Sequence, residues 1–117
     1  MSINEMIRNA ILPIVPICEP EFYDGDAREY CYFFYSSEPA MFSDGCPSAT
    51  RYFVYLHYYA PLGKNTLVIR AALQKAVVSA GFCWPSCDDA SDSISQHYVI
   101  SFEHFEFGEP EAENGEE

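Results

Sequence analysis

Two segments of this chain are aromatic or aliphatic at nearly every position: residues 30–36 and residues 51–59. A half-exposed strand alternates apolar and polar residues, because successive side chains point to opposite faces of its sheet. In the second segment both sets of alternate positions are aromatic or apolar instead. One face would carry Tyr52, Val54, Leu56 and Tyr58, and the other Phe53, Tyr55, His57 and Tyr59. Both faces of this predicted sheet need cover, and in so short a chain a partner subunit is the natural source of it.

Three further elements follow from the spacing of the apolar residues. Ser2 and Glu5 form a capping-box pattern, and the Ile and Met residues that follow recur at helical spacing, which predicts a helix over residues 3–12. A second apolar stripe predicts a helix over residues 66–80. Residues 97–107 alternate in part and form the last predicted strand.

The segments between these elements read mostly as loops. Three prolines make residues 13–20 extended and irregular rather than a central strand. Residues 37–50 are expected to form a loop between the two aromatic strands. Residues 82–84 are a candidate short strand, and residues 85–93 are expected to be a polar loop rich in Asp and Ser. Residues 109–117 read as a disordered acidic tail.

The order helix, strand, strand, helix, strand predicts an α+β fold. We expect a mainly antiparallel sheet with two helices packed on one face. The chain would form a single α+β domain over residues 1–107, followed by the acidic tail at 108–117. The second face of the sheet is then left to solvent or to a neighbouring subunit.

The net charge of the chain limits the classes of partner that it is expected to bind. The net charge is −12, and the six Lys and Arg residues form no cluster. Such a chain is a poor candidate for binding nucleic-acid phosphates, so the tyrosines are better explained by a core or a protein interface than by base stacking. No apolar run approaches the roughly 20 residues of a membrane span. We therefore expect neither direct nucleic-acid binding nor membrane insertion.

Candidate metal ligands are present but poorly spaced. His57, His97 and His104 lie on predicted strands, yet no two of them share a ligand spacing, and Cys83 and Cys87 are separated by three residues instead of two. The acidic loop around Asp88, Asp89 and Asp92 lacks the regular alternation of oxygen ligands found in calcium loops. The five cysteines are an odd number and are expected to be free thiols.

The sequence carries no positive sign of an enzyme. It has no nucleophile elbow and no phosphate-binding glycine loop. Cys31 lies within an aromatic strand, where a buried and inert thiol is expected. We expect no catalytic residue and no cofactor.

One stretch of sequence nevertheless resembles a known family. The segment Tyr32-Phe-Phe-Tyr-Ser-Ser-Glu-Pro-Ala-Met-Phe-Ser-Asp44 is followed by Arg51-Tyr-Phe-Val-Tyr-Leu-His-Tyr-Tyr-Ala-Pro61. A helix ending in Ser79-Ala-Gly-Phe82 and a strand Tyr98-Val-Ile-Ser-Phe-Glu103 come next. Together, over roughly residues 3–107, they resemble the small tail-completion, or tail-terminator, proteins of long-tailed bacteriophages and prophages, especially those of Gram-positive hosts.

That resemblance implies a structural virion protein. Its subunits would form a ring, usually hexameric, at the head-proximal end of the tail after assembly in the host cytoplasm. The ring would stop polymerisation of the major tail-tube protein and offer a surface to the head-completion, or neck, proteins. Two alternatives stay open: another phage neck or head-closure component, or a non-viral protein-binding module that uses an aromatic sheet face.

Self-association through the sheet and its adjoining loop follows from the two apolar faces. The helices can cover only one of them. The candidate residues for contact with another subunit or partner are Tyr35, Met41, Phe42, Tyr55 and Tyr59.

Overall fold

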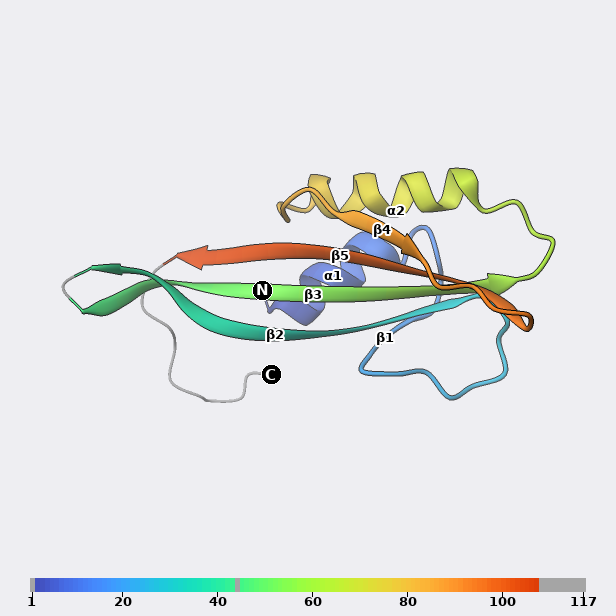
Figure 1. Cartoon of the computed structure of the whole chain (residues 1–117), viewed down its shortest axis with the longest axis horizontal. Coiled ribbons are helices and arrows are strands. Elements are labelled where there is room, and N and C mark those ends of the chain that lie inside the picture. The colour runs from blue at the N-terminus through green and yellow to red at the C-terminus, as the bar shows by residue number, and fades with distance from the viewer. Residues whose placement is uncertain (1, 44, 108–117) are drawn as a thin grey trace.

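A long antiparallel hairpin forms the centre of the molecule in the computed structural model, which describes residues 2–43 and 45–107 (Figure 1). Strand β2 (Tyr30–Ser43) pairs with β3 (Cys46–Pro61) from Tyr30 opposite Tyr59 to Ser43 opposite Cys46. Strand β5 (Ser95–Phe107) pairs antiparallel with the other side of β3. The three long strands therefore form one continuous sheet.

Two short strands extend this sheet to five, in the order β1-β2-β3-β5-β4. Strand β1 (Cys18–Pro20) pairs parallel with the start of β2. Its one proline, Pro20, fits an edge, because proline has no N–H to give to a second neighbour. Strand β4 (Ser86–Asp89) pairs antiparallel with β5. Each edge strand covers only part of its long neighbour.

Helices α1 (Ile3–Ile11) and α2 (Leu67–Ser79) pack on one face of the sheet. The predicted capping box is present, since Ser2 Oγ accepts from the Glu5 N–H and Glu5 Oε1 accepts from the Ser2 N–H. The core joins both helices to alternate residues of the strands. Its fully buried members include Ile7, Ile11, Phe33, Val54, Leu56, Tyr58, Leu73, Val77 and Ile100. The predicted α+β class, with two helices on a mainly antiparallel sheet, is confirmed.

The loop predicted over residues 37–50 is wrong. The two aromatic strands continue through this segment to Ser43 and from Cys46, and Gly45 in the short connection between them has φ +78°. Asp-Gly is a favoured pair for such turns, which need positive φ. This end of the hairpin extends beyond the core that the helices cover. Residues 37–50 therefore mix polar and apolar side chains, a pattern that is typical of a loop.

The segment from 82 to 93 also differs from the prediction. Residues 82–84 form no strand, and the expected polar loop contains β4. Three of the four β4 side chains are exposed, and its hydrogen-bonded register with β5 defines it rather than an apolar pattern. The predicted acidic tail lies outside the described residues.

Candidate assembly surface

The side of the sheet opposite the helices is aromatic and faces outward, and we call it the open face. Phe34 and Tyr55 keep 45% and 37% of their surface exposed, whereas Phe33 and Leu56 on the helix side are completely buried. The two faces thus have similar chemistry but opposite burial. The open-face side chains of the three long strands are Tyr30, Tyr32, Phe34, Phe53, Tyr55, His57, Tyr59, His97, Val99, Ser101, Glu103 and Phe105.

Aromatic rings on neighbouring strands stack across the open face. Tyr30 lies opposite Tyr59, with ring centroids 4.9 Å apart, and Tyr59 stacks on His97 at 4.1 Å with an angle of 11° between the planes. Tyr32 stacks on His57 at 4.7 Å. Cross-strand aromatic pairs stabilise a sheet beyond simple burial. The aromatic side chains of the open face are therefore already ordered by contacts within the single chain.

Two histidines form a hydrogen-bonded pair within this array. Nδ1 of His57 lies 2.8 Å from Nε2 of His97, so one ring must donate and the other accept. Burial, helped by His97, lowers the pKa of His57. Burial also lowers the pKa of His97, although Asp92 and Asp89 act in the opposite direction. The lowered pKa values favour the neutral form of both rings near pH 7, and the shared hydrogen bond needs at least one of them to be neutral.

The pair does not extend to a metal centre. Among the described residues, no three His, Cys, Asp or Glu side chains are placed to hold a metal ion. Asp89 accepts from the Ser91 N–H, and Asp92 accepts from the N–H groups of Ile94 and Ser95. Hydrogen bonds from the Ser91 side chain and then its N–H lower the pKa of Asp89, and the two backbone bonds lower the pKa of Asp92. The two carboxylates thereby shape the β4–β5 turn.

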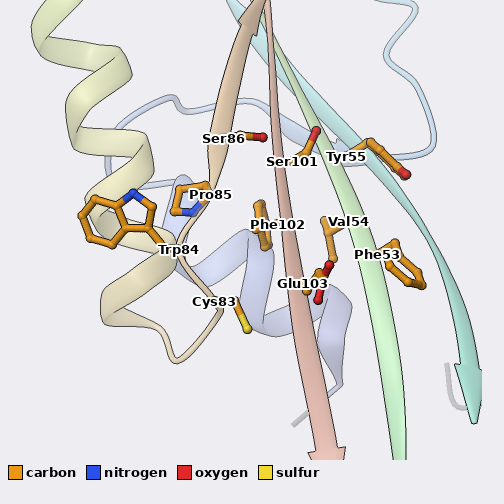
Figure 2. A pocket seen from close by; sticks show the side chains of 10 residues that line it. All are labelled: Phe53, Val54, Tyr55, Cys83, Trp84, Pro85, Ser86, Ser101, Phe102 and Glu103. Carbon is orange, nitrogen blue, oxygen red and sulfur yellow. The ribbon is translucent and has the colours of Figure 1, made fainter. Parts of the chain in front are cut away.

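A hollow of about 630 Å³ lies beside this array, on the part of the open face next to β4 (Figure 2). Trp84 and Pro85 flank β5 on one side, and Phe53 and Tyr55 of β3 lie on the other. The small side chain of Ser101 lies between them. Trp84 keeps 78% of its surface exposed. This hollow could not be predicted from the sequence, because only the β3–β5 register shows that Ser101 lies among large neighbours.

One ion pair borders the hollow. Arg51 donates to both carboxylate oxygens of Glu103, at 3.1 Å from Nη2, and its guanidinium lies 4.6 Å from the ring centroid of Phe53. The arginine is thereby fixed by a carboxylate and an aromatic ring at once. This rim of the hollow is polar, but its two charged side chains are paired with each other.

The five predicted contact residues lie in three places. Tyr55 and Tyr59 lie on the open face as expected. Met41 and Phe42 lie near the end of the hairpin, 49% and 64% exposed. Tyr35 is on the helix side instead, where its hydroxyl donates to Asn4 Oδ1 at 2.8 Å. The structure brings Tyr55 and Tyr59 onto one surface and separates them from Tyr35.

Comparison with known proteins adds evidence for the fold alone. No protein-family model and no curated protein matches this chain. One solved structure is 12% identical in sequence, with a TM-score of 0.54 over 96% of this chain and 99% of the other, and its name states no activity. Within residues 2–43 and 45–107, neither helix has the length and apolar character needed to span a bilayer.

Proposed function

We propose that this protein is a tail terminator of a long-tailed bacteriophage. Copies of the chain assemble into a ring, usually hexameric in this class, at the head-proximal end of the tail tube. The ring ends polymerisation of the tube protein and presents a surface to the head-completion proteins. The sequence resemblance over roughly residues 3–107 supports this assignment, and the α+β fold is compatible with it.

The open face is the observation that carries the proposal. Leaving apolar surface in water costs about 25 cal/mol per Å², and extended exposed aromatic patches mark contact sites. Tyrosine and phenylalanine are also enriched at protein interfaces. Both helices occupy the other side of the sheet, and in this proposal another chain covers Phe34 and Tyr55.

The polar groups of this surface favour assembly over chemistry. His57 binds His97, and Arg51 binds Glu103. Each of these side chains has a partner from its own chain that fixes its position. A surface on which these four side chains are already paired and the rings are stacked suits a rigid interface, because few side chains have to become ordered on association.

Assembly is tested with the purified chain and the tail-tube protein of the same phage. Light scattering and electron-microscopy class averages should show a ring, and tubes capped by it should stop growing. The double variant F34T/Y55T should lose the ring while it keeps a folded circular-dichroism spectrum. Ile94→Thr is the matched control, because Ile94 is apolar and 80% exposed but lies in the β4–β5 connection. A wild-type chain that stays monomeric at high concentration, with and without tube protein, would contradict the proposal.

Genetics separates the terminator from a head-closure component. Deletion of the gene from its phage should yield filled heads together with overlong or unjoined tails. Normal tails with leaking heads would assign the protein to head closure instead.

A further inference from the structure

The outward face of helix α2 is apolar. Leu73 and Val77 are the buried residues of this helix and face the core. Val68, Ala71 and Lys75 lie on the opposite side of the helix and are exposed, Val68 by 80%. In Figure 1, α2 forms the upper boundary of the molecule, and no other element of the described residues lies beyond it. A helix that is apolar on its outer side as well as on its core side is normally covered by another element.

Helix α1 has the pattern that α2 lacks. Its buried residues Ile3, Ile7 and Ile11 form one stripe, and Glu5 and Arg8 are exposed. Both helices pack against the same core, so the core that they cover does not explain the difference between their outer sides. Water suits the outward face of α1, whereas the outward face of α2 suits contact with another chain.

The charge of α2 also sets it apart from the rest of the chain. The helix carries Arg70 and Lys75 and no acidic residue, within a chain whose net charge is −12. Arg70 is turned inward, since its Nε donates to Thr66 Oγ1 and its guanidinium lies 4.1 Å from the ring centroid of Tyr98. Lys75 is exposed and forms no ion pair with any described residue. The outward face of α2 is therefore an apolar surface with one positive charge.

The hollow beside β4 offers a surface that fits such a helix. Its walls are aromatic and open to solvent, because Trp84 keeps 78% and Tyr55 37% of their surface exposed. The small side chain of Ser101 lies between these walls (Figure 2). Tryptophan and tyrosine are enriched among the residues that contribute most to binding at protein interfaces. An apolar helix face laid into an apolar groove is a recurring mode of recognition.

A carboxylate next to the hollow complements the lysine of α2. Asp88 lies on the open face, because it pairs with Val99 in the β4–β5 register, and it is exposed. Glu103, which also borders the hollow, is already paired with Arg51. Asp88 has no ion-pair partner among the described residues. The two surfaces therefore carry opposite charges, and complementary charges fix the orientation of partners and exclude wrong ones.

We propose that α2 of one copy docks in the hollow of the next copy, with Lys75 beside Asp88. This inference rests on the proposed ring and identifies the contact that builds it. The helix supplies an apolar surface and a positive charge, and the hollow supplies aromatic walls and a negative charge. The contact also covers Tyr55, one of the exposed aromatic residues of the open face.

A second copy is the occupant because each chain carries both halves of the contact. Helix α2 lies on the helix side of the sheet and the hollow lies on the open face, so one copy can bind a different neighbour through each. Such a head-to-tail contact closes into a ring when the rotation between copies allows it.

Substitutions at exposed positions of the full chain test both halves of the contact. Val68→Asp places a charge on the outward face of α2. Ile94→Asp is its control, because both side chains are 80% exposed and Ile94 lies in the β4–β5 connection. Trp84→Ala removes a wall of the hollow, and its control is Phe22→Ala, at an aromatic residue that is 63% exposed and follows β1. Circular dichroism and thermal melts check that each variant folds. Light scattering should show rings for both controls and monomers for the Val68 and Trp84 variants.

A charge exchange tests the position of the helix in the hollow. Lys75→Glu and Asp88→Lys each place like charges side by side and should raise the concentration needed for assembly by about tenfold. The double variant K75E/D88K restores the pair with reversed signs and should assemble like wild type. A double variant that assembles no better than either single variant would overturn the proposed contact.

Mixing tests the head-to-tail geometry. The Val68→Asp variant keeps an intact hollow and the Trp84→Ala variant keeps an intact α2, so equal amounts should form a heterodimer and stop there. Loss of assembly in only one of the two variants would indicate a symmetric contact between identical surfaces and overturn the proposal. Rings formed by both variants would overturn it and leave the tail-terminator function standing. If those rings no longer capped tubes, the two surfaces would belong to the contact with the tube protein instead. A wild-type chain that stays monomeric in the presence of tube protein would reject both proposals.

Discussion

Nδ1 of His57 lies 2.8 Å from Nε2 of His97 across the β3–β5 pair, and this bond holds only while at least one ring is neutral. Burial lowers the pKa of both rings in the folded protein, as it does that of His104. The unfolded chain, with ordinary histidines near pH 6.5, therefore binds more protons than the folded chain just below that pH. Folding stability is fully present above pH 7 and falls as the pH drops from 7 toward 5.

The measurement is urea unfolding at pH 7.5 and at pH 5.5, at a concentration where the chain is monomeric. Wild type should be less stable at the lower pH, and the double variant H57Q/H97Q should lose most of that dependence, with His104 supplying the remainder. An equal pH dependence in wild type and double variant would show that the pair titrates normally in the folded state.

Phe33 and Phe34 are neighbours in sequence and occupy opposite faces of β2. Phe33 is completely buried and Phe34 is 45% exposed. Phe33→Ala should cost about 3–5 kcal/mol of unfolding free energy, because it leaves a cavity in the core. Phe34→Ala should cost about 1 kcal/mol, mainly the ring contacts with Tyr55 and His57. Denaturant melts of the two variants at monomeric concentration compare these costs directly, and similar losses would mean that the faces are wrongly assigned.

The two faces of the second aromatic segment could be predicted from sequence, because alternate positions in a strand always face opposite ways. The helices could be predicted too, since capping and apolar spacing are local signals. The hairpin extension could not be predicted, because residues 37–50 lack an apolar alternation even though Asp44-Gly45 is a turn signal. Strand β4 is defined by its hydrogen bonds with β5. No local sequence pattern predicts that pairing.

The surface was less predictable than the fold. His57 and His97 are forty positions apart and meet only because Tyr59 pairs with His97 in the β3–β5 register. How far β1 and β4 cover their long neighbours is likewise decided by hydrogen bonds between distant segments. The aromatic pattern predicts Tyr35 and Tyr55 as contact residues alike, because it does not indicate which face of β2 the helices cover.

The five thiols should differ sharply in reactivity. Burial raises the pKa of Cys18 to about 12, with Arg8 opposing and Glu19 adding to the effect. Burial likewise raises the pKa of Cys31, which lies opposite Cys18 in the β1–β2 register. Cys46 and Cys83 are exposed. The thiolate is the reactive form, so iodoacetamide at pH 7.5 should label the exposed pair first.

Peptide mapping by mass spectrometry follows the labelling over time. Cys18 and Cys31 should react only when urea unfolds the chain, and Cys87 should fall between the two groups. Rapid labelling of Cys18 in the folded protein would show that β1 opens readily from the edge of β2.

The last prediction concerns DNA, which the proposed tail ring would have to let pass. The chain has a net charge of −12 and only six Lys and Arg residues. Several of these bind groups of the chain itself: Arg8 the Cys18 carbonyl, Arg51 Glu103, and Lys64 Glu29. Phosphate contacts from basic side chains release the counterions that drive non-specific binding. A chain whose cations are few and engaged should therefore repel a duplex, and a ring of copies should strengthen that field.

Anisotropy titrations with duplex and single-stranded DNA test this at about 50 mM salt, where electrostatic binding is strongest. Neither DNA should bind up to high micromolar protein, for wild type or for the monomeric F34T/Y55T variant. The charge-reversed variant E38K/E106K is the positive control, because both carboxylates are exposed and lie near the same end of the sheet. It should gain weak, salt-sensitive affinity if charge alone keeps DNA away. Micromolar binding by wild type, lost when salt is raised, would instead mean that the stacked tyrosines and histidines of the open face hold nucleic acid, and the tail-terminator proposal would lose its account of that surface.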